Sequence, residues 1–220
     1  MELLRSNVKV VEIVATADWI VQYAKHFRGV AVSEGSGADL ERISSMKAAC
    51  DVVAVVEMRD TEPLTLDKSR LYLALDSIRD PGNFGTILRI ANWFGIGTVL
   101  ASEDCVDLYN PKVVQASMGS VFRVDVHYCD LAAALTDAQK LGMPVYGTFL
   151  DGENIYTADI GCGGVVVLGN EGHGILPETE RCITRRLLIP SGSSPDTSPE
   201  SLNVAAATAV VCSEFYRRRF

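Results

Sequence analysis

The chain has no long apolar run, since none of its hydrophobic stretches reaches the roughly 18 residues that a helix needs to cross a bilayer. Residues 1–9 also lack the charged and then apolar layout of a secretory signal. We therefore expect a cytoplasmic protein with no membrane partner. With 220 residues, 48% of them apolar, the chain can bury a sizeable core in one large domain or two smaller ones.

Patterns for metal binding and for disulfides are absent as well. The six cysteines are dispersed, with no C-x-x-C pair and no histidine at zinc-finger spacing. They stand at positions 50, 105, 129, 162, 182 and 212. This spacing favours reduced, mostly buried thiols, and we predict no metal site.

Positive charge is scarce overall, because the formal net charge is −8. That balance argues against wholesale adhesion to nucleic acid. Between residues 181 and 220, however, six arginines face three acidic residues, which gives a local balance of +3. A basic C-terminal edge on an acidic body could still hold phosphates.

Apolar, β-branched runs alternate with helical patterns along most of the chain. This alternation is typical of a mainly parallel sheet covered by helices on both faces, so we predict an α/β fold. The expected strands span residues 8–16, 52–58, 71–78, 97–102, 122–128, 144–150, 163–170 and 185–190.

A linker divides the expected fold. In residues 59–69, RDTEPLTLDKS, charge, proline and threonine replace the hydrophobic periodicity. We predict a small N-terminal α/β domain at 1–64 and a larger domain at 65–220.

The clearest helical pattern follows the strand at 71–78. Its apolar residues recur at helical spacing and should form one buried stripe: Phe84, Ile87, Leu88, Ala91 and Phe94. Gly95 is placed to end the helix. Arg89 lies about 140° around the helix from Phe84, so it should point away from the stripe, which fits either simple solvation or a function.

Two polar loops follow strands in the middle of the chain. In DPGN, residues 80–83, Pro81 and Gly82 make a tight turn and Asn83 can cap the helix. In LGNEGHGI, residues 168–175, three glycines let the backbone turn sharply and approach a ligand. The carboxylate of Glu171 argues against a phosphate there and favours a neutral or cationic ligand, or a structural role.

A third loop leads from the last strand into PESLNVAAATAVV, residues 199–211. This stretch predicts a helix with Ser198 as a possible cap and Pro199 in its first turn. Ser201 and Asn203 exceed what capping requires. Singly, each loop has an equally good structural explanation, but three such loops, each after a strand, favour a ligand site at the carboxyl ends of a parallel sheet.

These loops lie in segments with a recognisable pattern: NFGTILRIANWFG at 83–95, LGNEGHG at 168–174, and IP at 189–190 followed by SLNV at 201–204. They resemble the three motifs of the SpoU (TrmH-type) RNA ribose 2′-O-methyltransferases, within the knotted SPOUT superfamily. ASMGSVFRVDV at 116–126 resembles the segment that joins motifs one and two. The resemblance covers roughly residues 70–219.

The resemblance implies an α/β fold whose C-terminal part is threaded into a deep trefoil knot, an exception to the rule against knots. It implies S-adenosylmethionine bound in the bend of the knot, tRNA or rRNA as substrate, and a homodimer with composite active sites. Residues 1–60 resemble the later part of an L30e-like RNA-binding domain. Its usual opening helix and strand do not precede Val8, so we expect a truncated form.

Motif three departs from the common pattern. Ser191 follows the Ile-Pro pair where Met is usual, and the loop to Ser201 is about four residues longer. Cofactor contacts from residues 191–199 are therefore not carried over from the family.

The resemblance assigns nine site residues. Five would form the polar active site: Asn83, Arg89, Glu171, Ser201 and Asn203. Four would hold the adenosyl part of the cofactor, largely through backbone groups: Thr148, Gly169, Ile189 and Leu202. The start of the last helix would then serve as a shelf for cofactor and catalysis.

The implied reaction moves a methyl group from a sulfonium to a ribose hydroxyl, which must lose a proton. Family accounts often make the motif-one arginine the general base. Neutralising a group with a pKa near 13 at pH 7 costs roughly 8 kcal/mol, at about 1.36 kcal/mol per pKa unit. Our hypothesis is instead that Arg89 clamps an RNA phosphate and favours developing charge on the 2′-oxygen. Glu171, Ser201 and Asn203 could share one hydrogen-bond network.

Two other functions fit parts of the pattern. A knotted RNA-binding protein that has lost catalysis would explain the altered motif-three loop. A nucleotide-binding oxidoreductase would use LGNEGHG as its dinucleotide loop. Such a loop belongs after the first strand, with an acidic residue about 20 positions later, whereas this one comes late in the chain.

Overall fold

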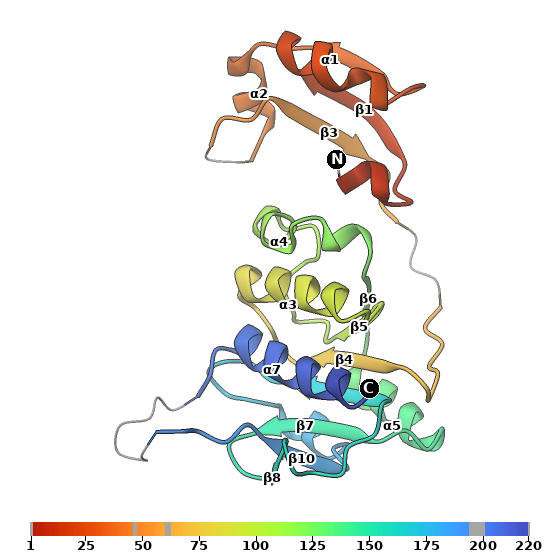
Figure 1. The fold of residues 1–220 in the computed structure, drawn as a ribbon, viewed down its shortest axis with the longest axis vertical. Coiled ribbons are helices and arrows are strands. Elements are labelled where there is room, and N and C mark those ends of the chain that lie inside the picture. Colours follow the sequence, from red (N-terminus) through yellow and green to blue (C-terminus); the bar gives the residue numbers. More distant parts are fainter. Residues whose placement is uncertain (1, 46–47, 60–62, 194–200, 220) are drawn as a thin grey trace. The chain divides into compact units, whose positions relative to one another are not determined.

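The computed structural model describes residues 2–45, 48–59, 63–193 and 201–219. The chain forms two compact units, Met1–Asp60 and Thr61–Phe220 (Figure 1). The division falls inside the predicted linker at 59–69, close to the boundary predicted after residue 64. None of the described helices is both long and apolar enough to cross a membrane.

The N-terminal unit is built on a three-stranded sheet in the order β2-β1-β3. Strand β1 pairs in parallel with β2 and antiparallel with β3. The elements are η1 (Glu2–Arg5), β1 (Val10–Ala15), α1 (Ala17–Tyr23), η2 (Ala24–His26), β2 (Ala31–Glu34), α2 (Gly37–Ile43) and β3 (Val52–Val56). The sequence predicted β1 and β3 but not β2, because β2 is short and mostly exposed, so no apolar run marks it.

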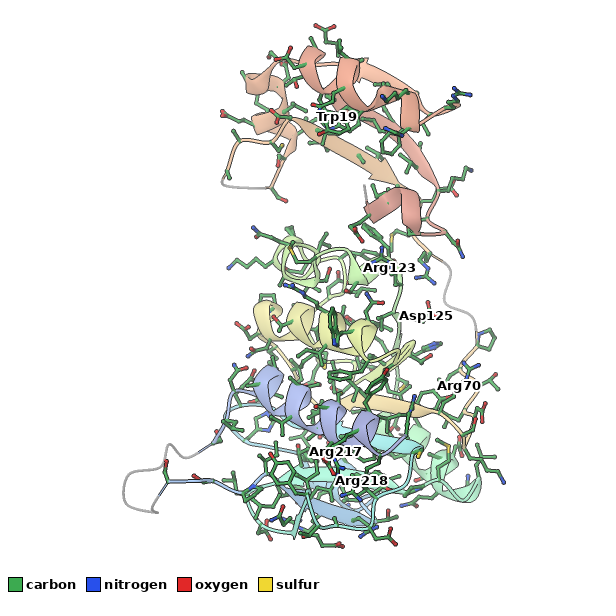
Figure 2. The ribbon with its side chains drawn as sticks, viewed as in Figure 1. Trp19, Arg70, Arg123, Asp125, Arg217 and Arg218 are labelled. Atoms are coloured by element: carbon green, nitrogen blue, oxygen red, sulfur yellow. The ribbon has the colours of Figure 1, made fainter. Side chains whose placement is uncertain are left out.

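The core of this unit is small. Ile13, Ala15 and Phe27 are buried together, and several apolar side chains of the three strands pack around them. Trp19 (Figure 2) contacts Phe27, with 5.7 Å between the ring centroids.

The larger unit is built on a seven-stranded sheet in the order β6-β5-β4-β9-β7-β10-β8, and every neighbouring pair is parallel. The strands are β4 (Leu71–Leu75), β5 (Thr98–Ala101), β6 (Asp125–Tyr128), β7 (Val145–Phe149), β8 (Glu153–Asn154), β9 (Gly164–Leu168) and β10 (Arg185–Leu188). All except β8 lie within predicted segments, which confirms the parallel α/β prediction. Two residues are too few for a pattern to reveal β8.

Helices cover both faces of this sheet (Figure 1). They are α3 (Pro81–Trp93), α4 (Pro111–Ser117), α5 (Leu131–Lys140), α6 (Pro177–Glu180) and α7 (Val204–Arg217), with a 3-10 helix, η3 (Ser120–Phe122). Leu71, Leu73 and Leu75 of β4 share a core with α3 and α7, whereas Tyr72 and Ala74 share a second core with α5. This alternation follows from the two-residue period of a strand.

Helix α3 has the predicted buried stripe. Its four apolar residues from Phe84 to Ala91 are completely buried, and Phe94 is partly buried at the C-cap. The prediction that Asn83 caps the helix was wrong. Asp80 is the N-cap, and its Oδ1 accepts from the backbone N–H of Asn83 at 2.7 Å. The side chain of Asn83 is therefore available for other contacts.

Helix α7 begins later than predicted. Asn203 is its N-cap, and its Oδ1 accepts from the backbone N–H groups of Ala205 at 3.0 Å and Ala206 at 3.2 Å. Asn203 thus provides the cap that the sequence assigned to Ser198, and the helix starts at Val204 rather than near Pro199. Ser198 and Pro199 themselves lie outside the described residues.

Candidate active site

The glycine-rich loop after β9 turns back on itself. Asn170 and Gly174 exchange two backbone hydrogen bonds, of 3.0 and 2.9 Å. A Cβ atom on Gly169 would lie 2.4 Å from the carbonyl carbon of Gly174 and from the backbone nitrogen of Ile175. Position 169 therefore requires glycine because the returning arm of the loop itself approaches so closely.

Asn170 joins this loop to the end of β4. Its Nδ2 donates to the carbonyl oxygen of Ser77 at 2.7 Å, and its Oδ1 accepts from the backbone N–H of Gly172 at 2.8 Å. Ser77 is buried and has a left-handed backbone, with φ of 58°. A serine in this conformation is strained and needs its neighbours to hold it.

Asp76 makes a second link between the same two segments. Its Oδ2 accepts from the backbone N–H of Leu176 at 2.8 Å. Because the side chain is buried, its pKa lies above the ordinary range, although the hydrogen bond from Leu176 opposes this shift. Neither Asp76 nor Asn170 was predicted from the sequence as a site residue. The available signal was a polar residue directly after the apolar strand β4 for Asp76, and a polar residue one glycine beyond the apolar strand β9 for Asn170.

The segment around Ser77 is supported from β5. The backbone N–H of Ser77 donates to Ser102 Oγ at 2.8 Å, and the Oγ of Ser77 donates to Asp104 Oδ2 at 2.7 Å. Arg79 also donates to Asp104 Oδ2, at 2.8 Å. The hydrogen bond from Ser102, with those from Ser77 and Arg79, lowers the pKa of Asp104 to about 2. Asp104 is thus ionised at neutral pH and holds this turn.

Three polar side chains form a relay across three elements. Because Asn203 Oδ1 accepts from the first turn of α7, its Nδ2 is the group that donates to Asn83 Oδ1, at 2.9 Å. The Nδ2 of Asn83 then donates to Glu171 Oε1. A carboxylate only accepts, so the cap at one end and the carboxylate at the other fix both amide orientations. We call Asn203, Asn83 and Glu171 the amide relay.

A cavity of about 550 Å³ adjoins the relay. All four predicted cofactor residues line it: Thr148, Gly169, Ile189 and Leu202. Glu171 and Ser201 line it as well, so Glu171 belongs both to the cavity and to the relay. Among the described residues, no hydrogen bond joins Ser201 to the relay. The cavity lies at the carboxyl ends of β7, β9 and β10, where parallel sheets bind ligands.

The charged groups of the cavity are mainly acidic. Three carboxylates (Asp151, Glu171 and Glu180) and one guanidinium, that of Arg186, line it, a formal balance of −2 with histidine neutral. Arg186 contacts Asp151 at 2.6 Å and Glu180 at 2.5 Å. The hydrogen bond to Asp151 is the main cause of a raised pKa of Arg186, and the one to Glu180 adds to it. Its guanidinium carbon lies 3.5 Å from the centre of the Phe149 ring. The cavity thus suits a cationic ligand better than a phosphate.

Arg89 lies apart from this cluster. It is exposed, as predicted, and does not line the cavity. It stands six residues after Asn83, about 9 Å farther along the helix axis. Within the part of the chain that the structure describes, its side chain forms no hydrogen bond or ion pair. Arg89 shares an exposed stripe of α3 with Thr86 and Trp93, whose exposed fraction is 83%.

The basic C-terminal edge is largely neutralised. Near the end of α7, Arg217 and Arg218 both contact the buried Glu214, at 2.8 and 2.7 Å (Figure 2). The hydrogen bonds from the two arginines lower the pKa of Glu214 to about 2, and the one from Arg217 has the larger effect. Arg185 pairs with Glu153 at 2.7 Å. These pairs leave this edge much less free charge for phosphates than the sequence indicated.

The six cysteines are free thiols, but the prediction that most of them are buried was wrong, because three are partly buried and Cys162 is exposed. Cys105 and Cys212 are buried, and burial raises the pKa of both thiols, that of Cys212 to about 12. In the described ranges, no group of three or more histidine, cysteine, aspartate or glutamate side chains is arranged to hold a metal ion.

Comparison with known proteins gives a family. The sequence model of the SpoU rRNA Methylase family matches residues 70–213, more than half of the chain. The 23S rRNA (guanosine-2′-O-)-methyltransferase RlmB of Coxiella burnetii is 31% identical over 214 residues, which cover 91% of this chain and 82% of that protein. The chain spans between 59% and 82% of the length of the first four curated relatives, and less than two thirds of two of them.

Solved structures agree in fold over nearly the whole chain. An RNA methyltransferase of the TrmH family from Porphyromonas gingivalis, itself described as putative, is 38% identical, with a TM-score of 0.84 over 99% of this chain and 86% of that one. The AdoMet-bound rRNA methyltransferase of Sinorhizobium meliloti is 27% identical, with a TM-score of 0.81 over 97% of this chain and 82% of that one. From these matches and the three motifs, the chain belongs to the SpoU family of S-adenosylmethionine-dependent RNA methyltransferases.

Proposed function

We propose that this protein transfers the methyl group of S-adenosylmethionine to a ribose 2′-hydroxyl of rRNA or tRNA. The observation that carries the proposal is the double position of Glu171, which lines the acidic cavity and also accepts from Asn83 in the amide relay. Cofactor pocket and polar site therefore meet at one carboxylate. Relatives named as 23S rRNA 2′-O-methyltransferases support the choice of the ribose.

The cavity fits the cofactor chemically. S-adenosylmethionine carries a sulfonium, so it is a net cation, and the balance of −2 around the cavity attracts it. Thr148, Gly169, Ile189 and Leu202 would hold its adenosyl part, and its sulfonium would supply an activated methyl group. Loss of that positive charge after transfer would weaken the attraction and favour release of the product.

The relay would position the acceptor. Asn83 and Asn203 are fixed in orientation by the cap of α7 and by Glu171, so a hydrogen bond from their remaining lone pairs or N–H groups to the ribose would carry no further ordering cost. With Ser201, they would align the ribose hydroxyl, and such alignment is worth up to about 7–11 kcal/mol of the barrier. The intact relay argues against the alternative of a catalytically inactive RNA-binding protein.

Arg89 would act from outside the cavity. It lies on the exposed stripe with Trp93, next to α7, whose outward residues include the small Ala206 and Ala209. An exposed tryptophan suits packing against a second copy. We therefore propose a homodimer in which Arg89 clamps the RNA phosphate at a composite site.

Three further features extend the proposal. The C-terminal part would be threaded as a trefoil knot. After β7 the chain passes to β9 and then to β10, and its last helix, α7, packs against α3. This path supports a knot. Residues 1–64 would be an L30e-like domain that helps to bind RNA. The reaction would take place in the cytoplasm, where its RNA substrates are.

The decisive experiment uses S-adenosylmethionine with a tritiated methyl group and both ribosomal and transfer RNA transcribed in vitro, which carry no modifications. We expect label in RNA, and we expect nuclease digestion to leave a dinucleotide resistant at the methylated ribose. Calorimetric titration with the cofactor and with NAD runs alongside. Label on a base, no label despite cofactor binding, or binding of NAD alone would each contradict the proposal.

A further inference from the structure

A second hollow, of about 420 Å³, lies between the first turn of α3 and helix α4. Its lining comes from both segments: Asp80, Pro81, Gly82, Lys112, Gln115 and Ala116. Gly82 directly precedes Asn83 of the amide relay. The hollow therefore opens one residue from the group that would align the acceptor ribose, outside the cofactor cavity.

The walls of the hollow are held in place by direct helix contact. A Cβ atom on Gly85 would lie 2.6 Å from the carbonyl oxygen of Val113 and 2.7 Å from Cβ of Ala116. α3 and α4 thus approach as closely as a glycine allows. Asn110 caps α4 by accepting from the N–H of Lys112 at 3.0 Å. A shape fixed by backbone contacts is formed before any ligand arrives.

The side chains at its rim are uncommitted. Lys112 and Gln115 are exposed and three residues apart, so they project from one face of α4. Neither side chain forms a hydrogen bond or ion pair with another residue in the described ranges. Many cations of the same unit are engaged, for example Arg79 with Asp104 and Arg185 with Glu153. The carboxylate of Asp80 is itself occupied by capping α3.

From this placement we propose that the hollow holds the nucleotide next to the methylated one, with Lys112 on its phosphate and Gln115 on a base edge. The inference rests on the proposed function. A ribose held at Asn83 brings the adjoining nucleotide within reach of a hollow one residue away. A lysine gives a sequence-independent phosphate contact, whereas a carboxamide can both donate to and accept from a base edge. Splayed single-stranded RNA presents both groups.

The test compares Lys112→Ala and Gln115→Ala with Lys68→Ala, an exposed lysine outside the hollow and without an ion pair in the described part. Methylation of unmodified large-subunit rRNA transcript is measured against RNA and salt concentration. Lys112→Ala should raise KM for RNA and reduce the logarithmic salt slope by about 0.7, as for one lost single-strand phosphate contact. Gln115→Ala should raise KM about fivefold with the slope unchanged. Both should keep kcat and cofactor affinity.

Each result has a definite meaning. If the wild type methylates the transcript and neither hollow variant changes KM, the hollow is not a subsite, while the methyltransferase function stands. If Lys68→Ala has the same effect as Lys112→Ala, general surface charge explains it and the proposal fails. If the wild type transfers no methyl group to RNA, the proposed function falls and takes this inference with it.

Discussion

Two arginine sites on neighbouring helices serve opposite purposes. Arg218, near the end of α7, is mostly buried: it pairs with Glu214 and donates to the carbonyl oxygens of Ala158 and Ile155. Arg89, on α3, is exposed and has no partner in the described part of the chain. α3 and α7 nevertheless pack on the same face of the sheet.

The difference shows that counting charge along the sequence does not locate an RNA surface. Six arginines in the last 40 residues indicated a basic edge. Three of them, Arg185, Arg217 and Arg218, instead form ion pairs that stabilise the fold. Arg89, in the ordinary helix α3, has no partner in the described residues and remains free for a ligand. Substitutions that affect either the stability of the fold or the binding of a ligand, but not both, therefore test this difference.

The largest expected effect is on the folding role. Arg218→Ala leaves the buried carboxylate of Glu214 with one partner and removes the donors to three carbonyl groups. We expect a loss of about 3 kcal/mol in the free energy of unfolding, measured by urea titration. Arg181→Ala, an exposed arginine without an ion pair in the described ranges, is the control and should change stability by less than about 0.5 kcal/mol. Equal effects would refute the folding role.

The same ion pairs predict an acid-sensitive stability. The pKa of Glu214 in the folded protein is about 2, below its ordinary value of 4.5. The unfolded chain therefore binds the proton more readily, and the stabilisation is complete above about pH 5 and lost as the pH falls toward 2. Comparing urea midpoints of the wild type and Glu214→Gln from pH 7 to 3 isolates this group. The two curves should converge on acidification, and parallel curves would contradict the assignment.

Gly169 lies where fold and ligand site coincide. In Gly169→Ala the new methyl group meets backbone atoms of Gly174 and Ile175, so the loop must move and the cavity must change shape. We expect cofactor affinity to fall about 10- to 100-fold in calorimetric titration, the equivalent of 1–3 kcal/mol of overpacking. Gly172→Ala is the matched control, because its Cβ would meet only Asn170 Oδ1, at 3.4 Å. A similar loss in both variants would show that the clash is not the cause.

Glu171 separates charge from hydrogen bonding. Glu171→Ala leaves Asn83 Nδ2 without its acceptor, which should cost about 0.5–1.5 kcal/mol and lower stability, cofactor affinity and methylation rate together. Glu171→Gln keeps an acceptor for Asn83 and removes only the charge. We expect it to retain stability and to lose affinity for the cationic cofactor. A change in rate alone for both variants would indicate direct chemistry instead of positioning.

The sequence predicted the fold well where periodicity was strong. Eight consecutive buried positions of β4 and its flank, and the stripe of α3, carry enough apolar residues to define strand and helix. The caps of α3 and α7 were each misassigned by a few residues. Four residues are acceptable caps, and only tertiary contacts choose among them: Asp80 or Asn83 for α3, and Ser198 or Asn203 for α7.

The candidate site was predictable in membership but not in connection. Motifs located Glu171, Asn83 and Asn203, which stand up to 120 residues apart, yet no local rule orders them into a relay. Asn170 contacts the carbonyl oxygen of Ser77, whose strained backbone no propensity indicates, and Asp76 contacts Leu176, 100 residues away in the chain. Such contacts are set by the meeting of strand ends, so only the folded sheet reveals them.

Arg89 gives the smallest expected change and the sharpest contrast with Arg218. Arg89→Ala should leave the urea midpoint and cofactor affinity unchanged, because the side chain has no partner in the described residues and does not line the cavity. RNA affinity should fall about threefold at moderate salt, with a salt slope reduced by about 0.7–0.9. Arg89→Lys keeps the charge but loses the planar fork, so it should recover the slope and only part of the affinity.

Single-turnover methylation at rising pH then shows whether Arg89 clamps the phosphate or acts as the base. A clamp leaves the pH profile of Arg89→Lys parallel to that of the wild type. A steep rise with pH in the wild type that vanishes in Arg89→Lys, at unchanged RNA affinity, would make Arg89 the base and overturn the clamp.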